Sequence, residues 1–178
     1  DNNFGIVEDS SRDRSIPYQI WLPSAEVDNI TFPLIILSHG SGGEYSNHTW
    51  LIESLVENGF IVAALNHPMN TTRDNTDEGV ISVWHRPHDI RVLLDYLLND
   101  SKWVDVIDEN RIGAAGFSSG GYTVLALAGA IYDPGLMSNK KFAERLRKDL
   151  KEKEMLEDFD PIDRDKNAAG GLINILKL

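Results

Sequence analysis

The feature that most constrains this chain is a Gly-Phe-Ser-Ser-Gly sequence centred on Ser118, between an apolar strand and an apolar helix. Residues 111–117 predict a short strand, and residues 118–131 predict a helix. So tight a turn needs small neighbours, and Gly116 and Gly120 stand two positions either side of Ser118. The turn presents the Ser118 hydroxyl at the carboxyl end of the strand, beside the N–H groups that open the helix. Ser118 is therefore the candidate nucleophile of a strand–turn–helix element known as a nucleophile elbow.

Two other structures use glycine at the junction of a strand and a helix. The simpler one is a turn in which a serine only caps the helix. The other is a dinucleotide site, which requires a Gly-x-Gly-x-x-Gly pattern that this junction lacks. The position of the serine between two apolar elements favours the nucleophile elbow over both.

The apolar pattern before the elbow predicts the fold class. Residues 34–38 and 60–65 are continuous apolar runs, which are typical of strands buried on both faces. Residues 48–58 have apolar positions at helical spacing, and a second apolar helical stripe follows Pro87. Strands and helices therefore alternate. This order predicts an α/β fold, with a mostly parallel central sheet and helices on both faces.

The chain divides into a lead-in and one domain. Residues 1–15 are polar and are predicted to be a lead-in, while residues 16–178 are predicted to form the domain. Within it, residues 18–22 alternate and end at a proline, which indicates an edge strand. Residues 139–158 are predicted to form a highly charged helix, which is either a solvated surface helix or part of an insertion or lid at 133–166. Residues 170–176 resemble the start of a further strand.

A second glycine-rich loop follows the strand at residues 34–38 and reads His-Gly-Ser-Gly-Gly from His39. An acyl-transfer enzyme needs about two backbone donors for the oxyanion. The backbone N–H groups of Ser119 and Ser41 are the candidate donors of such an oxyanion hole. Gly40 and Gly42 are candidate pocket residues, because glycine lets a ligand approach the backbone closely.

Together these motifs resemble the α/β-hydrolase superfamily, and within it the dienelactone hydrolases and the platelet-activating-factor acetylhydrolase-like esterases. The segments that carry the resemblance are residues 18–23, 33–43, 62–68, 86–90 and 116–122. The resemblance implies a serine esterase that cleaves a carboxylic ester or a related acyl bond through an acyl-enzyme on Ser118. A small-molecule ester is the implied substrate, and this chemistry needs no cofactor.

A nucleophilic serine needs a histidine base and an acid to orient it. In this superfamily the acid and the histidine follow the serine along the chain. All five histidines precede Ser118: His39, His48, His67, His85 and His88. Several acidic residues do follow Ser118, but none follows a recognisable strand. We therefore expect the triad acid and histidine to lie outside this sequence, which would then be a C-terminally truncated part of a longer enzyme.

The alternative is a catalytically inactive α/β-hydrolase-fold protein that binds ligands or partners without a complete triad. An unusual base would be a third possibility, and His67 is its first candidate because it follows a central strand. His67 is otherwise expected to line the pocket or to support it. The resemblance implies a structural role for His39 beneath the loop. Arg86 and Asp89 are expected to form an ion pair and cap at a helix start.

Composition narrows the classes of partner. The chain carries 17 basic and 28 acidic residues, a formal charge of −11, which disfavours nucleic acid and anionic membranes as partners. It has no cysteine, and its acidic stretch at residues 74–78 lacks the spacing of a calcium loop, so no metal site is predicted. No apolar run has the length of a membrane span. Neither compartment nor oligomeric state is indicated.

Overall fold

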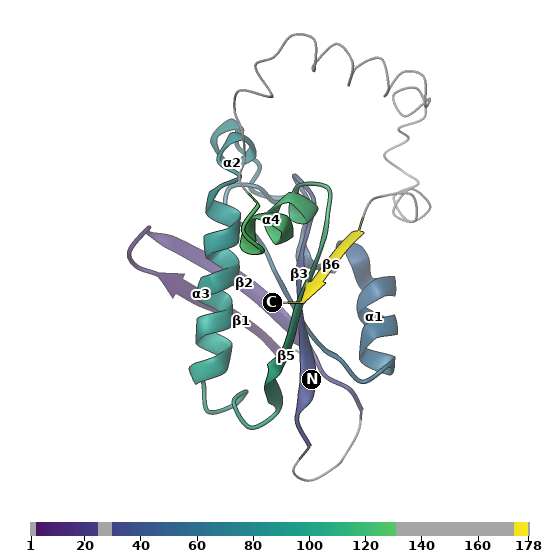
Figure 1. The fold of residues 1–178 in the computed structure, drawn as a ribbon. Coiled ribbons are helices and arrows are strands. Elements are labelled where there is room, and N and C mark those ends of the chain that lie inside the picture. The colour runs from purple at the N-terminus through teal and green to yellow at the C-terminus, as the bar shows by residue number, and fades with distance from the viewer. Residues whose placement is uncertain (1–2, 25–29, 131–172, 178) are drawn as a thin grey trace, which may run out of the picture. The chain divides into compact units, whose positions relative to one another are not determined.

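A computed structural model describes residues 3–24, 30–130 and 173–177. These residues form one six-stranded sheet in the order β1-β2-β4-β3-β5-β6 (Figure 1). The strands are β1 (Asn3–Asp9), β2 (Arg14–Trp21), β3 (Phe32–Ser38), β4 (Ile61–Leu65), β5 (Ile107–Phe117) and β6 (Ile173–Lys177). The helices are α1 (Thr49–Glu57), α2 (Asp77–Ile81), α3 (His85–Asn99) and α4 (Ser119–Leu127), with a 3-10 turn, η1 (Tyr45–His48), before α1.

The centre of the sheet is parallel and its margins are antiparallel. Strand β3 pairs in parallel with β4 on one side and β5 on the other. The β1–β2, β2–β4 and β5–β6 pairs are antiparallel. The predicted α/β fold is confirmed, and the parallel part consists of the three strands whose carboxyl ends carry the elbow and the His-Gly-Ser-Gly-Gly loop. Parallel strands place these ends along one edge.

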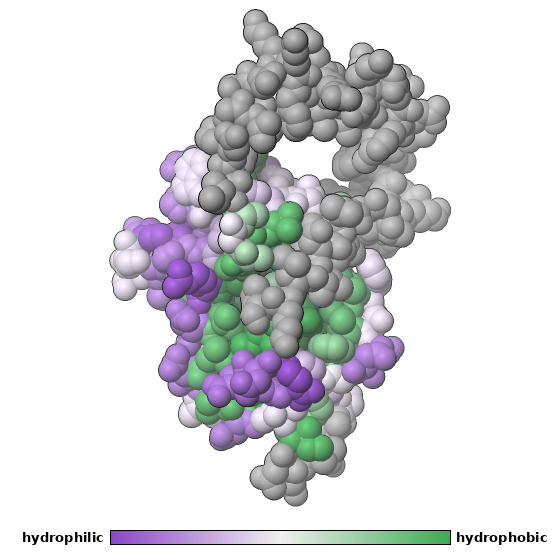
Figure 2. Space-filling view, viewed as in Figure 1, coloured by the Kyte–Doolittle hydropathy of each residue, from purple (hydrophilic) through white to green (hydrophobic). Residues whose placement is uncertain are grey.

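The central strands are apolar throughout because both faces are covered by helices. On one face Leu34 and Ile36 join the core formed with α3 and α4. On the other, Ile35 and Leu37 pack with Ile52 of α1. Figure 1 shows α1 and α3 on opposite sides of the sheet. Figure 2 shows apolar side chains gathered around the middle of the sheet, with hydrophilic side chains on the β1–β2 hairpin.

The N-terminal prediction requires a correction. Residues 3–9, expected to belong to a polar lead-in, form β1, and β2 is an inner strand between β1 and β4 rather than an edge strand. The residue types of β1 do not follow the burial pattern of a strand with one apolar face. Val7 and Asp9 are buried, while the apolar Phe4 and Ile6 are exposed. Backbone pairing with β2, rather than a buried apolar face, holds most of this strand.

Three further details concern the later part of the chain. The expected strand near the C-terminus is present as β6, but it runs antiparallel to β5. The segment after β4 contains the short helix α2, which Thr76 caps by accepting a hydrogen bond from the Gly79 N–H. The candidate insertion at 133–166 lies outside the described residues. Among those residues, no helix combines the length and apolarity needed to cross a bilayer.

Candidate functional site: a strained serine beside a glycine loop

Ser118 lies between β5 and α4 in a backbone conformation that residues other than glycine rarely adopt. Its φ is 52° and its ψ is −116°, and its side chain is exposed. Such a conformation costs about 1–3 kcal/mol and persists only where the surrounding structure enforces it. Here the buried strand before Ser118 and the helix after it impose the turn. The result is a hydroxyl raised above the carboxyl edge of the parallel strands.

The two flanking glycines are required by close packing. A Cβ on Gly116 would lie 2.2 Å from the carbonyl oxygen of Gly120, which is in the first turn of α4. A Cβ on Gly120 would lie 2.0 Å from the carbonyl oxygen of Ser38, at the end of β3. Neither distance is compatible with a side chain. The elbow, the start of α4 and the end of β3 are therefore packed backbone against backbone.

The His-Gly-Ser-Gly-Gly loop lies directly beside the elbow. The Cβ position of Gly40 is 3.5 Å from the Ser118 Cβ and 3.1 Å from the Phe117 ring. Within the part of the chain that the structure describes, the backbone N–H groups of Ser41 and Ser119 donate no hydrogen bond. Gly40, the residue before Ser41, thus lies against Ser118, and Ser119 follows Ser118 directly in the chain. The two candidate oxyanion donors therefore belong to neighbouring backbone segments.

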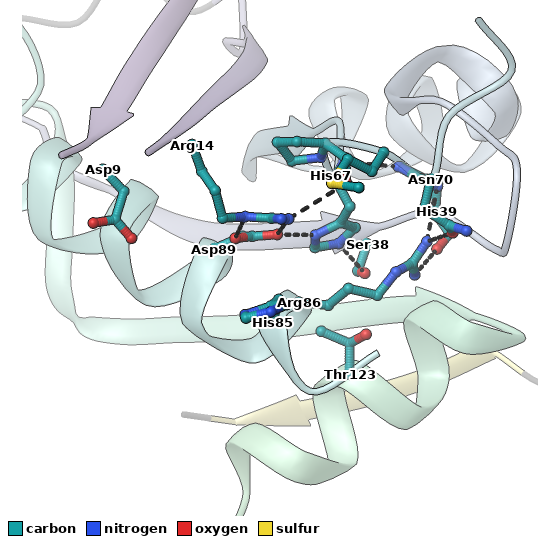
Figure 3. A network of polar contacts seen from close by, with 12 residues as sticks. Asp9, Arg14, Ser38, His39, His67, Asn70, His85, Arg86, Asp89 and Thr123 are labelled. Atoms are coloured by element: carbon teal, nitrogen blue, oxygen red, sulfur yellow. Dashed lines mark hydrogen bonds and ion pairs between the residues drawn. The ribbon is translucent and has the colours of Figure 1, made fainter. Parts of the chain in front are cut away.

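Two buried histidines support the loop from below (Figure 3). The Nδ1–H of His39 donates to the Gly40 carbonyl at 2.6 Å, and its Nε2 accepts from the His67 backbone N–H at 3.1 Å. Burial lowers the pKa of His39 well below its usual value, so it is neutral. His39 links the end of β3 to the end of β4, which is the supporting position that the family resemblance implied.

His67 is fully buried and hydrogen-bonded through both ring nitrogens. Its Nδ1 lies 3.0 Å from Asp89 Oδ2, and its Nε2 lies 2.9 Å from Ser38 Oγ. Because the Asp89 carboxylate only accepts, Nδ1 carries the proton and Nε2 accepts from the Ser38 hydroxyl. Burial lowers the pKa of His67 to about 4. With both nitrogens occupied, His67 is built to support the fold rather than to act as a base for Ser118.

Asp89 is the hub of this buried network. It accepts from His67, from Arg14 at 2.9 and 3.0 Å, and from Arg12 at 3.0 Å. Burial alone would raise the pKa of Asp89, but the hydrogen bonds from His67 and Arg14 outweigh it and hold the pKa below its usual value. The expected Arg86–Asp89 ion pair is therefore wrong: Asp89 binds the β1–β2 hairpin, because its place on the inner side of α3 faces that hairpin.

Arg86 instead reaches the glycine loop. Its guanidinium donates to the carbonyls of His39 and Gly40 and to Asn70 Oδ1. Figure 3 shows this side chain extending past His67 toward His39 and Asn70. Sequence reasoning had not assigned Asn70 to the site, although its oxygen also accepts from the Gly42 N–H at 3.3 Å. Gly42 itself has a φ of 66°, which its lack of a side chain permits.

A cavity of about 160 Å³ lies beside this network and not at Ser118. His67 and Asn70 contribute to its wall, as do Arg12, Arg14 and Arg86. His67 thus lines this cavity, while its predicted place in a pocket at Ser118 stays a prediction. Ser118 and Gly40 are not among its lining residues, and Ser118 is exposed in the described part of the chain.

Stability should fall as the pH falls below neutrality. His39, His48 and His67 are buried, and burial lowers the pKa of each below 6.5. In the unfolded chain they take up protons near pH 6.5, whereas folded His67 does so only near pH 4. The unfolded state therefore binds more protons between these values, and His67 alone costs about 1.4 kcal/mol per pH unit there. His39 and His48 act in the same direction.

Thermal unfolding followed by circular dichroism from pH 7.5 to 4.5 measures this effect. We expect a continuous fall in Tm below about pH 6.5. A Tm that stays constant down to pH 4.5 would show that these histidines are not held neutral by the fold.

Comparisons with known proteins identify relatives of this chain. A family model described as BD-FAE matches residues 18–168. Cutinase est1 of Thermobifida alba is 35% identical over 103 residues, which are 57% of this chain and 32% of the cutinase. This chain thus spans about a third of the length of that curated relative.

Solved structures share the fold at lower sequence identity. A ferulic acid esterase from Streptomyces cinnamoneus has a TM-score of 0.62 at 21% identity, over 72% of this chain and 54% of that chain. A dienelactone hydrolase from Anabaena variabilis has a TM-score of 0.51 at 16% identity, over 72% of this chain and 56% of that chain. The resemblance to dienelactone hydrolases is thereby supported for the fold, while the resemblance to platelet-activating-factor acetylhydrolases stays a prediction.

Proposed function

Because the chain belongs to the BD-FAE family, we propose that the protein is a serine hydrolase of carboxylic esters that forms an acyl-enzyme on Ser118. The observation that carries the proposal is the exposed Ser118 at a φ of 52°, with the Cβ position of Gly40 3.5 Å from the Ser118 Cβ. The names of the similar proteins, a cutinase and a ferulic acid esterase, support an ester as the bond that is cleaved.

The proposed reaction begins when Ser118 Oγ attacks the ester carbonyl. The carbonyl oxygen then becomes an oxyanion, which the N–H groups of Ser41 and Ser119 hold. Collapse of this intermediate expels the alcohol and leaves an acyl group on Ser118 Oγ. Water then releases the carboxylic acid by the same route. The chemistry calls for backbone donors and a proton carrier, with no metal or organic cofactor.

A base must take the proton from Ser118 in this scheme. All five histidines precede Ser118, and His67 and His39 are engaged in the buried network. We propose that the histidine and its acid come from sequence beyond these 178 residues. The alternative function, an inactive binding protein of the same fold, is favoured by one observation only: among the described residues, no histidine is hydrogen-bonded to Ser118.

A substrate panel with the full-length gene product distinguishes the two functions. We expect turnover of p-nitrophenyl acetate and methyl ferulate, and much slower turnover of the matching anilide and amide, because the leaving alcohol needs less proton transfer than an amine. Release of p-nitrophenol and of ferulic acid is measured by absorbance. Binding of methyl ferulate in calorimetry without any release of acid would support the inactive binding protein and overturn the esterase.

A further inference from the structure

Arg86 is a buried cation whose main partners are backbone carbonyls. Its side chain is 2% exposed, and it comes from the first turn of α3. Nη1 donates to the His39 carbonyl at 2.8 Å, and Nη2 donates to the Gly40 carbonyl at 3.2 Å and to Asn70 Oδ1 at 2.6 Å. No ion pair with Arg86 is formed among the described residues, since Asp89 is bound to Arg12, Arg14 and His67. Burying a guanidinium without an ion pair costs folding free energy. We therefore expect a functional reason for the placement of Arg86.

Peptide planarity links these carbonyls to the proposed oxyanion hole. The carbonyl of Gly40 and the N–H of Ser41 belong to one trans peptide group and point in opposite directions. When Arg86 holds the Gly40 carbonyl toward α3, the Ser41 N–H is turned to the opposite side of the loop. Gly40 itself is the loop residue whose Cβ position lies against Ser118. The His39 Nδ1–H and the Gly43 N–H donate to the same Gly40 carbonyl, at 2.6 and 3.2 Å. Arg86 adds the charged donor to this set and also holds the preceding carbonyl, that of His39, so it helps to fix the direction of the Ser41 N–H without touching the substrate.

A glycine loop needs such a support. Gly40, Gly42 and Gly43 lack the side chains that restrict the backbone, so their peptide groups can rotate at little cost. Arg86 contacts two successive carbonyls, and Asn70 ties the guanidinium to the Gly42 N–H. Planar, forked donors suit this task, whereas a lysine ammonium is a point charge and cannot span both carbonyls in the same way.

The charge of Arg86 is retained in the site. Burial lowers its pKa to about 10, with Asp89 opposing the change, so the guanidinium stays protonated at neutral pH. Hydrogen bonds from a charged donor are about twice as strong as neutral ones. A fixed positive charge behind the loop also favours negative charge developing in front of it.

We propose that Arg86 is the positioning residue of the oxyanion hole, which holds the Gly40–Ser41 peptide so that the Ser41 N–H faces the reacting carbonyl. The proposal rests on the proposed esterase function. It makes Asn70 a second, weaker support, because Asn70 touches the loop through Gly42 and through the Ser41 hydroxyl at 3.3 Å.

The test compares Arg86→Lys, Arg86→Gln and Asn70→Ala in the full-length protein with p-nitrophenyl acetate. We expect kcat to fall by about 10²-fold in both Arg86 variants and by about tenfold in Asn70→Ala, with KM changed less than about threefold, because the loss is confined to the transition state. Affinity for a trifluoromethyl ketone, which forms the tetrahedral oxyanion, should fall in parallel with kcat. Arg111→Lys, which changes an exposed arginine on β5, is the matched control and should leave kcat unchanged.

Folding is checked separately by circular dichroism and thermal unfolding. A folded Arg86→Lys or Arg86→Gln variant with the parental kcat and the parental trifluoromethyl ketone affinity would overturn the proposal. If both Arg86 variants fail to fold, Asn70→Ala decides: parallel losses of kcat and ketone affinity support the proposal, and unchanged values overturn it. A parental protein that hydrolyses no ester would instead contradict the esterase function itself.

Discussion

Replacing Ser118 with alanine should lower ester hydrolysis by about 10⁴-fold or more, because the covalent route through the acyl-enzyme is lost. Fold and stability should change little, since Ser118 is exposed and its side chain caps nothing by a hydrogen bond in the described structure. The readout is the initial rate with p-nitrophenyl acetate at matched concentrations of folded protein. Lysine side chains of the protein also react slowly with p-nitrophenyl acetate. This background rate is measured with heat-denatured protein and subtracted.

Two control variants separate the loss of the nucleophilic hydroxyl from changes in the backbone of the turn. Ser119→Ala keeps the backbone N–H proposed for the oxyanion hole, so its kcat should stay within about threefold of the parent. Ser118→Gly should be as inactive as Ser118→Ala but should unfold at a higher temperature, because glycine relieves the strain at a φ of 52°. Equal activity in Ser118→Ala and the parent would show that another residue performs the reaction.

Replacing Asp89 with asparagine should destabilise the protein by about 3–5 kcal/mol, because removal of one partner of a buried ion pair leaves the other charges uncompensated. Asp89 is fully buried and accepts hydrogen bonds from Arg12, Arg14 and His67. An asparagine would place an NH₂ group against some of these donors. It would also replace the carboxylate that fixes the tautomer of His67 by accepting from its Nδ1–H.

Urea denaturation measures the loss, with Asp108→Asn as the matched control. Asp108 pairs with Arg111 within β5 at a partly exposed site, so its replacement should hardly move the urea midpoint. An Asp89→Asn protein whose free energy of unfolding lies within about 1 kcal/mol of the parent would show that the hairpin and α3 are held mainly by apolar packing.

The parallel centre of the sheet was predictable because its signals are strong and local. Strands β3 and β4 are continuous apolar runs, and helices cover both of their faces. The tight turn between β5 and α4 was predictable because backbone contacts at Gly116 and Gly120 exclude every residue but glycine. Sequence patterns record such constraints directly, so fold class and candidate nucleophile could both be inferred.

The buried polar network was missed, although the sequence contained a signal for it. Arg86 and Asp89 continue the apolar stripe of α3 formed by Ile90, Leu93 and Leu97, so two charged residues occupy positions that face the core. Charges on a buried stripe must be paired or hydrogen-bonded. Their partners could not be predicted, because Arg14 and the Gly40 loop come from distant segments that only the sheet order brings to α3.

The most direct test of Ser118 as the nucleophile is covalent labelling of the full-length protein with a fluorophosphonate probe. The labelled protein is digested with a protease, and the modified residue is identified by mass spectrometry. We predict a single adduct on the Ser118 hydroxyl, which is absent from Ser118→Ala and retained in Ser119→Ala. Labelling of Ser118→Ala equal to that of the parent, or an adduct on another residue such as Ser38 or Ser41, would contradict the assignment.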